Sequence, residues 1–179
     1  MLQKENAVLV VIDVQGKLAT LMHKHKRLFE NVNRMIDGAK ALEIPIIWTE
    51  QIPDKLGATV DVVKEHLDGV ELLTKNTFSC CGGPGFNEKL DQLGKSQILV
   101  CGIETHVCVY QTCKDLLANG KEVHLVTDAV SSRFKQNYYL GMERIKDLGG
   151  IMTSVEMSLF EMLKVAEGDQ FKQVIKVVK

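Results

Sequence analysis

The sequence predicts an α/β fold: an open, six-stranded parallel sheet with helices on both faces, arranged as a Rossmann-like three-layer sandwich. Along the 179 residues, short apolar segments alternate with segments in which apolar residues recur at helical spacing. The apolar segments are nearly continuous, as in strands buried on both faces, and right-handed crossovers then place helices on both sides of the sheet. No linker, repeat or low-complexity segment interrupts the pattern, so we expect a single domain spanning residues 1–179.

Each expected strand is a short apolar segment that ends at polar residues. The first, rich in Val and Ile, ends at Asp13, and the second follows Pro45 and leads into the polar residues 49–51. The last begins at Ile151, directly after two glycines. The apolar segments of the six strands begin at residues 7, 46, 72, 98, 123 and 151.

The helices are expected between these strands and at the end of the chain. Apolar residues three or four apart predict a first long helix around residues 28–39, and helical stretches cover about 86–93, 106–119 and 136–148. An amphipathic closing helix is predicted by apolar residues at i, i+3, i+4 and i+7, namely Phe171, Val174, Ile175 and Val178. Helices in these places supply the crossovers that parallel strands require.

Composition and charge argue against two classes of partner. The chain is 45% hydrophobic and 25% charged, and 22 Lys and Arg against 23 Asp and Glu give a net charge of −1. No block of five like charges occurs, so the electrostatic basis for binding nucleic acid or an anionic membrane is missing. The longest apolar run, 7–12, is far shorter than the roughly 20 residues that cross a bilayer, and the N-terminal MLQKEN lacks a signal-peptide pattern. We expect a cytoplasmic protein with a small-molecule substrate.

The five cysteines are an odd number, and none shows the C-x2-C spacing of a zinc or dithiol site. We expect no structural disulfides in a reducing compartment. Cys101 in a strand and Cys113 inside a helix fit the role of small core residues, and Cys80 and Cys81 lie in the glycine-rich loop SCCGGPGF. Cys108 lies near the start of the helix that follows the fourth strand, where the helix dipole favours a reactive thiolate.

Polar residues follow the expected strands at their carboxyl ends, which meet at one edge of a parallel sheet. Ligands bind at that edge, where the strand order reverses. Any single polar residue at this edge can be explained without a function, because the chain returns to solvent where a strand ends. Together, an acid (Asp13), a cation (Lys75) and a thiol (Cys108) supply a base, a positive charge and a nucleophile. We expect Asp13 and Cys108 at solvent-reachable positions of this edge. The polar strand-end residues are Asp13, Thr49, Glu50, Gln51, Lys75, Glu104, Thr105, His106 and Asp128.

Three separated motifs, VVIDVQ at 10–15, TKNTFSC at 74–80 and CGIETHVCVYQT at 101–112, resemble the isochorismatase-like cysteine hydrolase family. Further segments resemble its branch of isochorismatase domain-containing proteins: WTEQ at 48–51, HLVTDAVSSR at 124–133 and TSVEMSLFEML at 153–163. The resemblance implies a catalytic triad of Asp13, Lys75 and Cys108. It also implies a cis peptide bond between Ile103 and Glu104, and an oxyanion hole formed by the backbone N–H groups of Glu104 and Cys108.

Two departures from the wider family bear on cofactor and substrate. Nicotinamidases of the family bind a metal through histidines, but the corresponding segment TEQIPDKLG contains none, so we expect neither a metal nor another cofactor. Leu18 stands where an aromatic residue is frequent, which argues against a flat aromatic substrate. Loops 15–22, 51–60, 76–86 and 131–138 should form the pocket, and the side chains expected to contact the substrate are Gln15, Leu18, Gln51, Phe78 and Phe134.

We therefore expect a cysteine hydrolase that cleaves a small carboxamide or related acyl compound through a thioester, with Asp13 as base and Lys75 as the positive charge. The alternatives are isochorismatase-type vinyl-ether hydrolysis, a non-catalytic binding or assembly protein on the same scaffold, and a thiol-redox role. A receiver-type phosphoacceptor domain is disfavoured, because Lys75 and Asp128 follow the third and fifth strands in the reverse of its order. The closing helix and the Tyr138-Tyr139 pair add apolar surface, so we expect a homo-oligomer.

Overall fold

The computed structural model describes residues 1–179 and confirms the predicted fold class. Six strands form one sheet in the order β3-β2-β1-β4-β5-β6, and all neighbouring strands are parallel. The strands are β1 Ala7–Ile12, β2 Ile46–Gln51, β3 Leu72–Lys75, β4 Gln97–Ile103, β5 Glu122–Ser131 and β6 Ile151–Thr153. The α-helices are α1 Gly16–Thr20, α2 His25–Ala41, α3 Pro53–Leu56, α4 Asp61–Lys64, α5 Phe86–Leu93, α6 Tyr110–Ala118, α7 Lys135–Asp147, α8 Val155–Leu163 and α9 Gly168–Val178.

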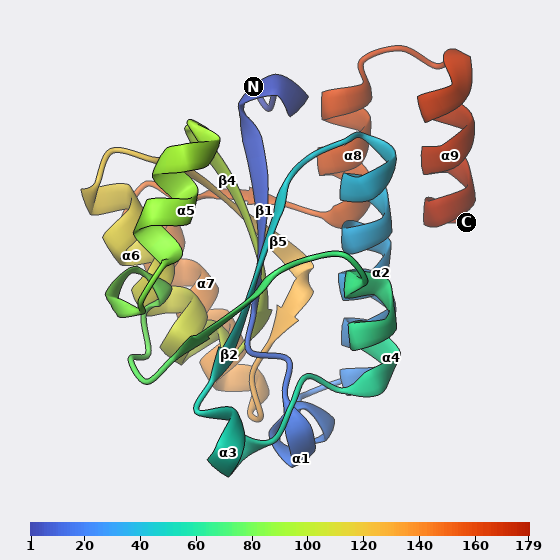
Figure 1. The fold of residues 1–179 in the computed structure, drawn as a ribbon. Coiled ribbons are helices and arrows are strands. Elements are labelled where there is room, and N and C mark those ends of the chain that lie inside the picture. Colours follow the sequence, from blue (N-terminus) through green and yellow to red (C-terminus); the bar gives the residue numbers. More distant parts are fainter.

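Two layers of helices cover the sheet. Helices α2, α8 and α9 pack together on one face, and α5, α6 and α7 lie on the other (Figure 1). Every residue of β1 is buried, because alternate side chains enter the two separate cores that this arrangement creates. No helix is both long enough and apolar enough to span a membrane.

Strand order fixes where a ligand can approach. β1 pairs with β2 on one side and with β4 on the other, so the chain winds in opposite directions from this point. The short helices α1 and α3 lie at the carboxyl ends of the strands, at the opposite end of the molecule from the N-terminus (Figure 1). This is the edge at which the sequence predicts a site.

The structure differs from the sequence prediction at β5, at α8 and at the short helices α1, α3 and α4, which were not predicted. β5 continues to Ser131 after its register against β4 shifts, so Asp128 lies inside a strand and not at its end. Helix α8 was not predicted, although Ser154 accepts the backbone N–H of Met157 and so caps its first turn. Its buried residues recur at helical spacing: Val155, Ser158, Leu159 and Met162.

Replacing either core cysteine by alanine tests the packing of the two cores. Cys101 in β4 and Cys113 in α6 are both fully buried, one in each core, as the sequence predicts. Removing the sulfur leaves a small void, so we expect Cys101→Ala and Cys113→Ala each to lower the free energy of unfolding by about 1 kcal/mol. Urea denaturation measures the change, and unchanged midpoints in both variants would contradict it.

Candidate active site

A buried ion pair lies at the carboxyl edge of the sheet. Lys75, the last residue of β3, places Nζ 2.6 Å from Oδ2 of Asp13, the residue that follows β1. Thr49 of the intervening β2 donates its hydroxyl to the other carboxylate oxygen at 2.9 Å. The Lys75 and Asp13 side chains are 2% and 6% exposed. The strand ends meet as predicted, and Asp13, which the sequence places at a solvent-reachable position, is largely buried beside Lys75.

The Lys75 ammonium is held by further oxygen atoms. Nζ donates to the backbone carbonyls of Thr77 and Phe78 at 3.1 and 3.2 Å, and to Oε1 of Gln51 at 3.3 Å. The loop after β3 therefore folds over the ammonium and removes it from water. A buried ammonium with these partners acts as a fixed positive charge beside Asp13.

Cys108 lies in a π-helical turn, Thr105–Val109, between β4 and α6. Its Sγ donates to Oε1 of Gln51 at 3.1 Å. Burial raises the pKa of the Cys108 thiol, the negative charge of Asp13 raises it further, and Lys75 lowers it. Burial and Asp13 therefore favour the neutral thiol in the free protein, against the thiolate that the sequence predicts at the helix start.

The carboxylate of Asp13 is tuned by opposing influences. Burial raises its pKa above the ordinary value of 3.8, while the charge and hydrogen bond of Lys75 and the hydroxyl of Thr49 oppose the increase without cancelling it. A carboxylate with a raised pKa is a stronger base. The site thus combines a neutral thiol with a carboxylate that is prepared to accept its proton.

Two glutamines form a positioning pair. Gln15 is fully buried; its Nε2 donates to the carbonyls of Gln51 and Gly57 at 3.1 and 2.7 Å, and its Oε1 accepts the Gln51 N–H at 2.7 Å. Because each of these atoms has a protein partner, Gln15 holds Gln51 in place. The side-chain oxygen of Gln51, Oε1, must face Lys75, which can only donate, and it also accepts a hydrogen bond from the Cys108 thiol. The sequence identified both residues but assigned them only to substrate contact.

A pocket of about 120 Å³ opens onto this cluster. Of the residues expected at the substrate, Gln15, Leu18, Gln51 and Phe78 line it, together with Asp13 and Cys108. Phe134 does not line it: this residue is 61% exposed and precedes α7. Lys75 lies behind Asp13 and does not line the pocket either.

Other polar residues predicted at the strand ends make their contacts outside the pocket. Oδ1 of Asp128 accepts the N–H of Val155, and His106 contacts Ser132 through Nδ1 at 3.0 Å, so neither belongs to the pocket. The expectation that Asp128 would join the site is wrong because β5 extends past that residue. Cys80 is buried and lies 3.7 Å from the Thr49 hydroxyl.

Glu104 lines the pocket and has a free backbone donor. The peptide bond between Ile103 and Glu104 is cis, and the Glu104 N–H makes no hydrogen bond within the protein. Its side chain points to other partners: Oε1 accepts both the backbone N–H and the Nε–H of Arg133 at 3.1 and 3.0 Å. Glu104, whose backbone N–H is free, therefore lines the same pocket as the thiol.

A contact that the sequence did not reveal supports the turn carrying Cys108. Gly141 of α7 lies so close to this turn that an added Cβ would be 2.8 Å from the backbone of Thr105. Only the assembled structure shows that α7 crosses here, although a glycine within a helical pattern is the signal to examine.

Gly141→Ala should therefore displace the Cys108 turn. We expect a loss of about 1–3 kcal/mol in stability and a clear decrease in activity, because backbone atoms must move to admit the methyl group. Gly38→Ala is the matched control: the atoms nearest to its added methyl belong to the Leu159 side chain of α8 and not to backbone. Equal activity of the two variants at a temperature where both are folded would contradict the role of Gly141.

Comparisons with known proteins agree with this site and fold. The Isochorismatase domain family matches residues 7–157. A secreted isochorismatase effector of Phytophthora sojae is 37% identical over 179 residues, 97% of this chain and 85% of that protein. The structure called MAR1 ribonuclease from Caenorhabditis elegans is 35% identical, covers 99% of this chain and 91% of that one, and has a TM-score of 0.93. The Escherichia coli YcaC gene product, described as an octameric hydrolase of unknown specificity, has the same fold at 20% identity, with a TM-score of 0.92 over 98% of this chain and 88% of that one. The chain thus belongs to the isochorismatase family and has the fold of its hydrolases.

Proposed function

We propose that this protein is a cysteine hydrolase that cleaves a small carboxamide or related acyl compound. One observation carries the proposal: Cys108 and Asp13 face the same small pocket, and Lys75 pairs with Asp13 from behind. A nucleophile, a base and a fixed positive charge in this arrangement are the components of acyl transfer. Asp13, Lys75 and Cys108 are therefore the proposed catalytic groups.

The reaction begins with proton transfer from the Cys108 thiol to Asp13. The sulfur attacks the substrate carbonyl carbon, and the π electrons move to oxygen, where the backbone N–H groups of Glu104 and Cys108 would stabilise the negative charge. When the tetrahedral adduct collapses, Asp13 returns the proton to the leaving amine and a thioester remains. Asp13 then deprotonates a water that attacks the thioester, and the acid leaves as Cys108 regains its proton.

The pocket limits the size and polarity of the substrate. Its volume of about 120 Å³ admits a small acyl group, and Leu18, Leu56 and Val107 make part of its wall apolar. Phe78 is 53% exposed and lines the same space. We therefore propose a short, partly apolar amide, with the polar carbonyl directed toward Cys108.

Mass spectrometry of the intact protein tests this proposal. The chain is incubated with a mixed library of small amides and esters, and the mass of the protein is recorded before turnover is complete. We expect an acyl adduct on Cys108 in the wild type and none in Cys108→Ala. Hydrolysis without any adduct, unaffected by that substitution, would overturn the thioester route.

The same assay separates the alternative functions. Cysteine-independent cleavage of isochorismate would favour vinyl-ether hydrolysis, and absence of turnover across the library would favour a binding or assembly protein. RNA belongs in the panel because the Caenorhabditis elegans relative is called a ribonuclease, although the net charge of −1 gives this chain no general attraction for RNA.

We also propose a homo-oligomer, which light scattering tests against the 20.0 kDa chain, and a cytoplasmic location, which the five free cysteines favour.

Hydrolysis should be insensitive to chelators. Near the pocket, Glu50 of β2 is buried and its Oε1 accepts the backbone N–H of Thr59, and the segment TEQIPDKLG offers no imidazole. Separated carboxylates without histidine make a poor site for zinc or iron. We expect unchanged kcat and KM after dialysis against EDTA; activity that is lost and then restored by a divalent ion would contradict this.

A further inference from the structure

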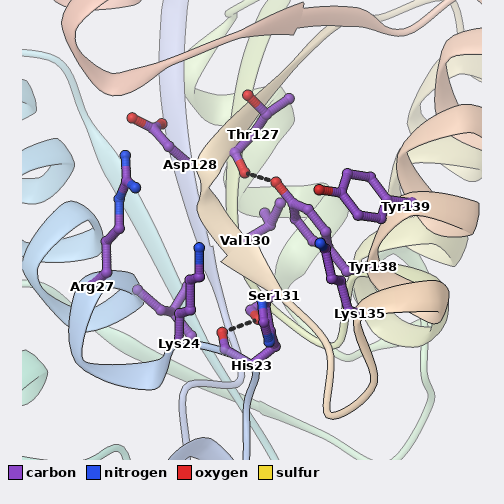
Figure 2. Close-up of a pocket in the computed structure, with 11 residues that line it drawn as sticks. His23, Lys24, Arg27, Thr127, Asp128, Val130, Ser131, Lys135, Tyr138 and Tyr139 are labelled. Carbon is purple, nitrogen blue, oxygen red and sulfur yellow. Dashed lines mark hydrogen bonds between the residues drawn. The ribbon is translucent and has the colours of Figure 1, made fainter.

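A second pocket, of about 220 Å³, lies beside the last part of β5 and shares no lining residue with the candidate active site. Figure 2 shows Lys24 and Arg27 on one side of this strand and Lys135, Tyr138 and Tyr139 of α7 on the other. β6 pairs with β5 only as far as Val126, so the strand beyond that residue is left uncovered. The pocket occupies this space.

Three cations line the pocket without an ion-pair or hydrogen-bond partner. Lys24, Arg27 and Lys135 form no ion pair, and none donates a side-chain hydrogen bond. The nearest interaction of Lys135 is with the Tyr139 ring, whose centroid lies 5.5 Å from Nζ. Charged groups gathered in one concavity repel each other, so an anion between them would be stabilised.

The only carboxylate in the lining does not neutralise these cations. Oδ1 of Asp128 accepts the N–H of Val155 at 2.9 Å, and no cation lies within ion-pair distance of it. The first turn of α2 carries no acid, although acids are favoured at that position. Three positive side chains against one negative leave the pocket with an excess of two positive charges.

The loop that carries Lys24 is held firmly against β5. The N–H of His23 donates to the carbonyl of Ser132 at 2.9 Å, and the hydroxyl of Ser131 donates to the carbonyl of His23 at 2.8 Å (Figure 2). Lys24 itself has a φ of +54°, a backbone conformation that residues other than glycine rarely adopt. The backbone therefore fixes the position from which this lysine reaches the pocket.

Aromatic and apolar groups form the opposite wall. Tyr138 donates its hydroxyl to the carbonyl of Thr127 at 2.8 Å, and its ring packs edge-on against that of Tyr139 with centroids 5.1 Å apart. Val130 of β5 is also part of the lining. The pocket thus offers the positive charge of Lys24 and Arg27 at one side, and ring surface together with the charge of Lys135 at the other.

We propose that this pocket binds a small phosphate monoester, with the phosphate among Lys24, Arg27 and Lys135 and the organic group against Tyr138 and Tyr139. A dianionic phosphate matches the excess of two positive charges, and the Arg27 guanidinium can donate to two phosphate oxygens. A pocket of about 220 Å³ suits a small molecule better than an extended polymer. The site is independent of the proposed hydrolysis.

Isothermal titration calorimetry with phenyl phosphate tests the proposal. The Cys108→Ala chain is used, so that no acyl chemistry contributes, and ionic strength is held constant with NaCl. We expect saturable binding that weakens about tenfold in Lys24→Gln and in Arg27→Gln, because each removes one charge-assisted contact. Lys114→Gln, which removes an exposed charge from α6 outside the pocket, should bind like the parent.

Ligand comparisons decide the chemical class. Phenol, which lacks the anion, should not bind, and benzoate, with one negative charge, should bind more weakly than phenyl phosphate. Equal binding of benzoate, tighter binding of a short ribo-oligonucleotide through the same residues, or binding unaffected by Lys24→Gln and Arg27→Gln would each overturn the proposal. Melting curves confirm that the variants are folded, which is expected because all three substituted side chains are exposed.

Discussion

Cys108→Ala should lower amide hydrolysis by about 10³-fold or more while leaving the fold stable. The substitution removes the only thiol that lines the pocket beside Asp13, and without it no thioester can form. Only a sulfur atom is lost from a side chain that borders a cavity, so the cost in unfolding free energy should be about 1 kcal/mol or less. Turnover of the amide identified by the mass-spectrometric screen provides the measurement.

The other buried cysteines are the controls for this result. Cys101→Ala and Cys113→Ala remove the same atom from the cores and should keep their activity despite reduced stability. Thermal denaturation curves show whether each variant is folded at the assay temperature, and so separate loss of folding from loss of catalysis. If Cys101→Ala and Cys108→Ala lost activity equally, Cys108 could not be the nucleophile.

The sequence predicts most of the fold because hydrophobic periodicity determines which segments can be buried. The apolar runs before Asp13 and Glu104 mark strands whatever their neighbours are, and the carboxyl ends of parallel strands must meet. Asp13, Lys75 and Cys108 could therefore be placed at one edge from spacing alone. Burial of the ion pair could not, because it depends on how the loop after β3 folds over Lys75.

Contacts between distant segments account for what the sequence did not reveal. Gln15 and Gln51 lie 36 residues apart, and their reciprocal hydrogen bonds exist only once β1 and β2 are paired. Phe134 was expected in the pocket because its loop follows a strand, yet the extension of β5 places it outside. Local pattern identifies elements and their ends, whereas side-chain partners depend on the assembled sheet.

Breaking the Lys75–Asp13 pair should have the largest effect on stability of any substitution at the site. Lys75→Met leaves a buried carboxylate without its counter-ion, and Asp13→Asn leaves a buried ammonium, so each should cost about 3–5 kcal/mol. The double variant removes both charges and should recover much of that loss. Urea denaturation of the four proteins forms a double-mutant cycle, and additive losses would contradict coupling between the two side chains.

Asp13 and Lys75 should change the reactivity of the Cys108 thiol in opposite directions. Asp13 raises the pKa of the thiol and Lys75 lowers it, so Asp13→Asn should move the pH profile of iodoacetamide alkylation to lower pH even as hydrolysis is lost. Adding Lys75→Met to Asp13→Asn should move the profile back to higher pH, because the thiolate then loses its only nearby cation. Making the second substitution in the neutral background avoids a change in the protonation of Asp13.

Lys75→Arg separates charge from shape. It keeps the positive charge, so the pH profile of Cys108 alkylation should stay closer to wild type than in Lys75→Met. Hydrolysis should still fall, because the space around Lys75 places oxygen atoms 2.6–3.3 Å from one ammonium and does not fit a planar guanidinium. Peptide mapping assigns the alkylated cysteine at each pH. A profile that is identical in Asp13→Asn and in the double variant would show that Lys75 does not act on the thiol, and its role would then be confined to holding Asp13.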